Sequence, residues 1–206
     1  MVNQFLTMEE EMIEAEIEEK KSRFIANVFR ICSEDDALEK LKEVKKVHRD
    51  AKHHVFAYRI ANEKERFSDD GEPSGTAGVP ILDILRGENL ENILVVVTRY
   101  FGGILLGTGG LVRAYSEATK EALKKAKKVQ MKLCTEYEIK MEYRYLDILN
   151  HYLKMKNIPI KKVEYEETIC MNIIVEKSLE EEAIKEISDV LDRNANLKAV
   201  DTYYFV

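Results

Sequence analysis

The stretch that decides the fold runs from Asp69 to Gly110 and contains all nine glycines of the chain. It begins DDGEPSGTAG (residues 69–78) and ends RYFGGILLGTGG (residues 99–110), with the apolar run Ile93–Thr98 between the two. Glycine lets the backbone take a positive φ and approach a ligand closely. Each glycine turn leads into a predicted helix, whose first N–H groups point outward with the positive end of the helix dipole behind them. Two such turns beside one buried strand predict an electropositive notch that binds anions.

An alternative interpretation is that these glycines only end strands and begin helices. Charged and hydroxyl side chains within and between the turns favour a ligand site instead. His53 and Arg59, on one face of the predicted strand 52–60, are predicted accessory contacts. No catalytic residue or metal ligand is assigned, because the histidines and cysteines lack metal-ligand spacing. The predicted ligand contacts are Asp69, Asp70, Glu72, Ser74, Thr76, Arg99, Tyr100, Gly102, Gly103, Thr108 and Arg113.

Residues 67–78 and 98–107 resemble the signature of the Impact/YigZ family, and the resemblance extends from about Lys20 to Ala126. It implies an amino-terminal α/β sandwich with the fold of the second domain of ribosomal small-subunit protein five, followed by a smaller ferredoxin-like domain. For function it implies regulation of translation, which eukaryotic relatives carry out through a starvation-responsive kinase pathway. For bacterial and archaeal-type relatives it implies binding to nucleic acid or to the ribosome.

The chain is predicted to be α+β and to form two domains, residues 1–130 and 131–206. In the first, alternating apolar residues predict a hairpin over 10–31. Ser33 is predicted to cap a helix with an acidic first turn, and a long helix is predicted over 111–127. The second domain has the order βαββαβ, which is that of ferredoxin-like plaits. Its predicted elements are strand 131–141, a helix to 156, strands 160–166 and 168–175, helix 179–192 and strand 197–205.

Composition and charge narrow the class of protein. Of the 206 residues, 45% are hydrophobic and 34% charged, and no apolar run approaches the roughly 20 residues that span a bilayer. No secretion signal is visible, and the three cysteines are interpreted as buried thiols of a reducing cytoplasm. The net charge is −6, yet residues 20–135 hold 22 basic and 16 acidic residues. The segment that contains the glycine turns is therefore the basic part of the chain, which suits an anionic partner.

Three functions are hypotheses at this point. In the favoured one, the basic domain is a non-enzymatic, translation-linked binding module that contacts RNA, the ribosome or a translation factor. It needs no cofactor, and its binding is predicted to weaken with salt. In the second, Asp69, Asp70 and Glu72 hold Mg²⁺ for phosphoryl transfer or hydrolysis, although the lysine of a P-loop is missing after Gly78. In the third, the notch recognises a peptide or a protein surface.

Overall fold

The computed structural model describes residues 3–206, which form two compact units. One unit covers residues 5–130, and the other combines residues 131–206 with Asn3 and Gln4. Both units are built from antiparallel strands and helices, so the predicted α+β class is confirmed. The strand β1 (Gln4–Met8) lies next to β7 (Lys128–Met141) in the strand order of the second sheet.

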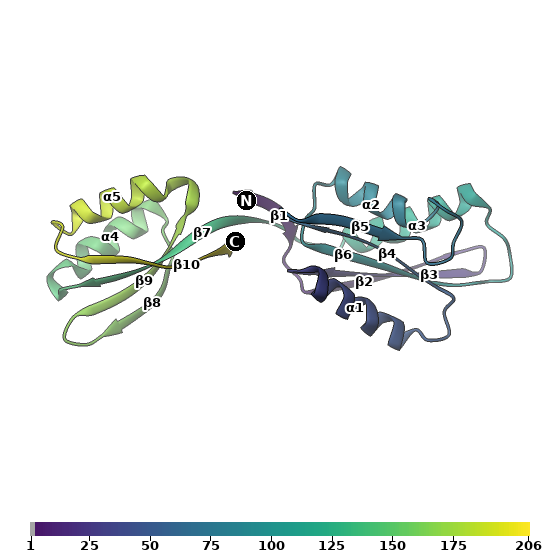
Figure 1. Ribbon diagram of the computed structural model, residues 1–206, viewed down its shortest axis with the longest axis horizontal. Helices are drawn as coiled ribbons and strands as arrows, with labels where there is room; N and C mark the ends of the chain where they lie inside the picture. Colours follow the sequence, from purple (N-terminus) through teal and green to yellow (C-terminus); the bar gives the residue numbers. More distant parts are fainter. Residues whose placement is uncertain (1–2) are drawn as a thin grey trace. The chain divides into compact units, whose positions relative to one another are not determined.

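The first unit is a five-stranded antiparallel sheet with the strand order β2-β3-β6-β4-β5. Helices α2 and α3 cover one face of this sheet, and α1 covers the other (Figure 1). The predicted hairpin is confirmed as β2 and β3. The elements are β2 (Met12–Glu19), β3 (Ser22–Arg30), α1 (Glu34–Val47), β4 (His53–Ile60), β5 (Lys64–Ser68), α2 (Gly78–Gly87), β6 (Ile93–Tyr100) and α3 (Thr108–Leu123).

The central strand β6 explains why the sheet can be covered on both faces. Val95 and Val97 belong to the core beneath α2 and α3, whereas Leu94 and Val96 belong to the core beneath α1. A strand that is buried on both faces requires apolar side chains at every position, and β-branched residues fit a pleated sheet well. The apolar run ends at Arg99, where the glycine-rich connection to α3 begins.

Helix α1 begins as its sequence predicts. The Oγ atom of Ser33 accepts a hydrogen bond of 3.2 Å from the backbone N–H of Asp36. Within the first turn, the carboxylate of Glu34 accepts hydrogen bonds from the hydroxyl of Tyr58 at 2.6 Å and from Arg66 at 3.1 Å, and it pairs with Lys64. These contacts fasten the amino end of α1 to β4 and β5.

This cluster predicts a specific acid sensitivity. The hydrogen bond from Lys64, followed by those from Tyr58 and Arg66, lowers the pKa of Glu34 from 4.5 to about 2. Because the unfolded chain takes up this proton first, the stabilisation is complete above pH 4.5 and is lost as the pH falls toward 2. Urea denaturation of the wild type and of Glu34→Gln should give midpoints that differ at pH 7 and converge near pH 2. A difference that is constant with pH would show that the Glu34 carboxylate is not held in this way.

The second unit has the predicted βαββαβ order. Its strands follow the spatial order β10-β7-β9-β8, which is the arrangement of a ferredoxin-like plait, and α4 and α5 lie on one face of the sheet (Figure 1). Beneath the helices lies a separate core that includes Ile139, Leu149, Ile173 and Ile187. Besides β7, the elements are α4 (Leu146–Lys156), β8 (Ile160–Tyr165), β9 (Ile169–Glu176), α5 (Glu180–Val190) and β10 (Asn196–Phe205).

Candidate functional site

The first glycine turn is organised around the carboxylate of Asp69. This carboxylate accepts hydrogen bonds from the backbone N–H groups of Gly75 at 2.8 Å, Ala77 at 3.1 Å and Gly78 at 2.8 Å. The turn can close because Gly71 and Gly75 have φ angles of +87° and +75°. The amino end of α2 is therefore already occupied by an anion of the protein itself. The prediction that this helix terminus faces a ligand is corrected accordingly, and Asp69 is a capping residue.

Removing this cap should weaken α2. We expect Asp69→Ala to lower the free energy of unfolding by about 2 kcal/mol, at the upper end of the range for a helix cap, because three N–H groups lose one acceptor. Urea denaturation would measure the loss, and Asp83→Ala, which removes an exposed carboxylate from the same helix, is the matched control. Equal effects of the two substitutions would contradict the assignment of Asp69 as the cap.

The end of β6 carries a buried ion pair. The Nη1 atom of Arg99 lies 2.7 Å and 3.0 Å from the two carboxylate oxygens of Glu72, and the hydroxyl of Tyr115 donates to the same carboxylate at 2.7 Å. The side chains of Arg99 and Glu72 are only 7% and 3% exposed. Burial, followed by the nearby charge of Glu72, raises the pKa of Tyr115, so its hydroxyl stays protonated and donates. The rings of Phe24 and Phe101 lie 5.6 Å from the guanidinium carbon.

This ion pair corrects two predicted roles. Arg99 does not reach an anion in solvent, because its charge is neutralised by Glu72 beneath the surface. Glu72 is likewise not free to bind Mg²⁺, and neither is the capping carboxylate of Asp69. Within the part of the chain that the structure describes, no group of three or more His, Cys, Asp or Glu side chains is placed to hold a metal ion. The hypothesis of Mg²⁺-dependent catalysis by these carboxylates therefore loses its ligands.

Other predicted residues also have internal partners. The hydroxyl of Thr76 donates to the carbonyl of Pro73 at 2.7 Å, and the hydroxyl of Tyr100 lies 2.9 Å from Nδ1 of His48. The Oδ2 atom of Asp70 accepts a hydrogen bond of 2.7 Å from the backbone N–H of His54. The Asp70 contact holds the first turn against β4, whereas the Tyr100 contact joins the end of β6 to the residue that follows α1.

The two predicted accessory residues lie at opposite ends of α2. The Nδ1 atom of His53 donates a hydrogen bond of 2.9 Å to the carbonyl of Asp70, so His53 lies at the glycine turns. The guanidinium of Arg59 instead donates to the carbonyls of Leu85 and Leu90, at 3.3 Å and 3.0 Å. Arg59 is therefore a structural residue at the carboxyl end of α2 and is not part of the notch.

The second glycine turn leaves the amino end of α3 open. Gly107, with φ +72°, is the N-cap, and no side chain in residues 3–206 caps this helix. Thr108, Gly109 and Arg113 are exposed there. The Nη1 atom of Arg113 lies 3.9 Å from the point where a Cβ atom on Gly109 would be. Because Glu72 of the first turn pairs with Arg99, where the connection from β6 to α3 begins, the first turn and this connection meet at the same end of β6.

The structure adds two lysines that sequence reasoning did not assign to the site. Lys20 and Lys21 form the turn between β2 and β3 with φ angles of +47° and +64°, a left-handed conformation that is uncommon for lysine. This turn lies against Gly102, whose N–H donates to Oγ of Ser22 at 3.1 Å. A two-residue turn of consecutive lysines was the available signal, since such a hairpin tip must project its charges into solvent.

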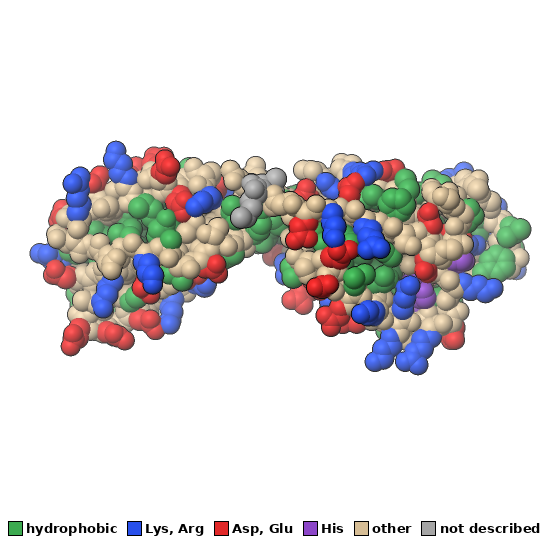
Figure 2. Space-filling model, in the orientation of Figure 1, with side chains coloured by type: hydrophobic (Ala, Val, Ile, Leu, Met, Phe, Trp, Pro, Cys, Tyr) green, Lys and Arg blue, Asp and Glu red, His purple; other side chains and the backbone are tan. Residues whose placement is uncertain are grey.

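Four exposed side chains lie on the segments that meet here, which are the β2–β3 turn, the connection from β6 to α3 and the start of α3. We call this set the glycine-loop surface; its residues are Lys20, Lys21, Phe101 and Arg113, with the backbone of Gly103 and Thr108. The side chain of Phe101 is 50% exposed, and neither the two lysines nor Arg113 forms an ion pair with any other residue that the structure describes. Figure 2 shows hydrophobic and basic side chains together at the right-hand end of this unit, where the connection from β6 to α3 lies in Figure 1.

Ser74 is the remaining predicted contact, and it is exposed on the first turn. Helices long and apolar enough to cross a membrane do not occur among the described residues.

Comparisons with known proteins agree with this architecture. Residues 20–123 match the model of the Impact N-terminal domain. The chain is 38% identical over 179 residues to the IMPACT family member YvyE of Bacillus subtilis, covering 86% of this chain and 82% of that protein. It is 34% identical over 186 residues to the IMPACT family member YigZ of Escherichia coli, covering 88% and 91%. A solved crystal structure of a hypothetical protein matches 98% of this chain and 99% of its own, with a TM-score of 0.66 and 32% identity.

Proposed function

Because the chain belongs to the Impact family, we propose that it is a translation-linked binding protein and that its glycine-loop surface contacts RNA. The observation that carries this proposal is that three cations without ion pairs and one exposed aromatic ring lie on the segments that meet near the open amino end of α3. The link to translation is supported by the regulation of translation that the family resemblance implies.

The chemistry of the glycine-loop surface suits a nucleic-acid backbone. The free N–H groups at the start of α3 and the guanidinium of Arg113 are donors for phosphate oxygens. Lys20 and Lys21 add positive charge from the neighbouring hairpin, on the side of Arg113 that also carries Glu18 and Glu19. The ring of Phe101 is available to stack on an unpaired base. Phosphate contacts and stacking together favour single-stranded RNA or loops over a regular duplex.

The left-handed lysines also support a functional role for the hairpin tip. Residues other than Gly, Asn and Asp take this conformation at a cost of roughly 1–2 kcal/mol each. Lys20 and Lys21 take it side by side at the tip, where both side chains are exposed. A two-residue hairpin loop requires this conformation, and lysine at both positions directs two charges into solvent at the tip.

The experiment is fluorescence anisotropy of a labelled single-stranded RNA titrated with the full chain at low salt. The double variant Lys21→Ala/Arg113→Ala should bind about tenfold more weakly, because it loses two phosphate contacts. Lys42→Ala/Lys46→Ala is the matched control, since it removes two exposed charges from α1 on the other face of the sheet. If both variants weaken binding equally, the RNA is attracted by overall charge and the proposed surface is wrong.

A further inference from the structure

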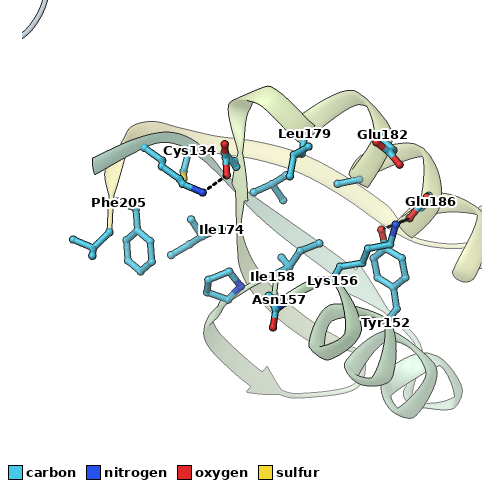
Figure 3. A pocket seen from close by; sticks show the side chains of 16 residues that line it. Cys134, Tyr152, Lys156, Asn157, Ile158, Ile174, Leu179, Glu182, Glu186 and Phe205 are labelled. Atoms are coloured by element: carbon cyan, nitrogen blue, oxygen red, sulfur yellow. Dashed lines mark hydrogen bonds and ion pairs between the residues drawn. The ribbon is translucent and has the colours of Figure 1, made fainter. Parts of the chain in front are cut away.

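The second unit contains a pocket of about 470 Å³ that the proposed function does not use. It lies between the carboxyl end of α4, the amino end of α5 and the adjoining ends of β7 and β9 (Figure 3). Its floor is apolar and deeply buried, since Cys134, Ile174 and Val175 are each at most 5% exposed. Leu179 and Phe205 stand at its mouth with 54% and 37% of their surface exposed. A volume of this size with an apolar floor is typical of sites for small molecules.

Ion pairs flank the pocket at its two ends (Figure 3). Lys132 pairs with Glu176 at 2.8 Å, and Lys156 pairs with Glu186 at 2.6 Å. Burial raises the pKa of the Cys134 thiol, so the floor contributes no charge. Because each lysine pairs with a carboxylate, neither Lys132 nor Lys156 offers an unpaired positive charge to a ligand.

The end of the pocket at α5 keeps an excess of negative charge. The Oε2 atom of Glu186 forms an ion pair with the ammonium of Lys156 and accepts a hydrogen bond of 2.8 Å from the hydroxyl of Tyr152. Glu182, one turn earlier on α5 and also in the pocket lining, forms no ion pair or hydrogen bond with the other residues that the structure describes. Two carboxylates thus share one ammonium group beside an apolar cavity.

We propose that this pocket binds a small amphipathic amine, with its apolar body against Ile158, Ile174 and Phe205 and its cationic nitrogen beside Glu182 and Glu186. The apolar body would cover apolar side chains that line the cavity, including the exposed part of Phe205. The nitrogen would supply the positive charge that the α5 end of the pocket lacks. A ligand with a carboxylate head would instead have to displace Glu176 or Glu186 from its lysine. The proposal therefore predicts that a ligand with a positively charged head group binds better than one with a negatively charged head group.

Three probes with the same apolar chain and different head groups test the effect of the charge of the head group. Octylammonium, octanoate and octanol would be titrated into the full ¹⁵N-labelled chain below their micelle concentrations, with amide shifts at Ile158, Ile174 and Ala183 as the readout. We expect octylammonium to bind at least tenfold more tightly than octanoate, with octanol in between. Equal or tighter binding of octanoate would overturn the proposal. The absence of amide shifts with all three probes at about 1 mM, the highest concentration used, would overturn it as well.

Two variants test the location. Glu182→Gln should weaken octylammonium binding by about fivefold, which is the upper range for an exposed ion pair. Glu181→Gln is the matched control, because Glu181 is the preceding residue of α5 and lies outside this pocket. Ala183→Leu should fill the cavity and abolish the shifts for every probe while the amide spectrum stays folded. Equal effects of Glu181→Gln and Glu182→Gln, or retained binding in a folded Ala183→Leu chain, would contradict the assignment.

Discussion

Arg99→Ala is expected to lower the free energy of unfolding of the first unit by about 3–5 kcal/mol. The substitution leaves the carboxylate of Glu72 buried with only the hydroxyl of Tyr115 as a hydrogen-bond donor. An uncompensated buried charge of this kind costs several kcal/mol. Urea denaturation followed by circular dichroism would measure the loss, and hydrogen-exchange protection of β6 would assign it to this unit.

Two controls separate this effect from the general loss of an arginine. Arg86→Ala breaks an ion pair with Glu65 in which the arginine is 48% exposed, and it should cost at most about 1 kcal/mol. The double variant Arg99→Met/Glu72→Leu removes both charges and should recover most of the stability. A stable Arg99→Ala protein that no longer binds RNA would instead show Arg99 to be a ligand contact, as the sequence alone predicted.

Gly102→Ala is expected to produce the second large loss, of about 3 kcal/mol. A Cβ atom at this position would lie 2.0 Å from the carbonyl carbon of Lys21 and 2.1 Å from its oxygen. Because both are backbone atoms, the hairpin tip or the β6–α3 connection has to move, and forced rearrangement of this kind is strongly destabilising. The same movement would separate the two lysines from Phe101, so RNA affinity should fall with stability. Urea denaturation would measure the loss of stability, and fluorescence anisotropy on the same preparation would measure the loss of RNA affinity.

Gly75→Ala is the matched control for this steric argument. Gly75 has a φ of +75°, but nothing lies within 4 Å of the position that its Cβ atom would take. Its substitution should cost only the roughly 1–2 kcal/mol of a left-handed alanine and leave the hairpin in place. If Gly75→Ala were as costly as Gly102→Ala, close approach of the hairpin would not be the reason for glycine at residue 102.

The sequence predicted the elements whose patterns are long and locally determined. The apolar run of β6, the Ser33 cap and the βαββαβ order of the second unit are confirmed. Strands β1 and β5 were missed, because five residues each give too short a pattern to recognise. Helix α3 also begins at Thr108, three residues before the predicted start, since an uncapped glycine-rich first turn carries no helix signal.

The site was harder to predict, because its decisive contacts join residues far apart in the sequence. From the sequence, Arg99 is predicted to be a free cation. In the structure it pairs with Glu72, which is 27 residues earlier in the chain. Likewise, the sequence predicts an open anion site at the amino end of α2. In the structure this end is capped by Asp69, which is nine residues before Gly78. The lysines of the hairpin enter the site only because Gly102, about 80 residues later, lets the β6–α3 connection approach them.

The most direct test of the central claim is the salt dependence of RNA binding by the full chain. The logarithm of the affinity for a single strand should fall linearly with the logarithm of the salt concentration, with a slope of roughly 0.7 for each phosphate contact. We therefore expect the slope of Lys21→Ala/Arg113→Ala to be shallower than that of the wild type by about 1.4, whereas Lys42→Ala/Lys46→Ala keeps the wild-type slope. Identical slopes for all three proteins, or no binding at low salt, would contradict the claim that the glycine-loop surface contacts RNA.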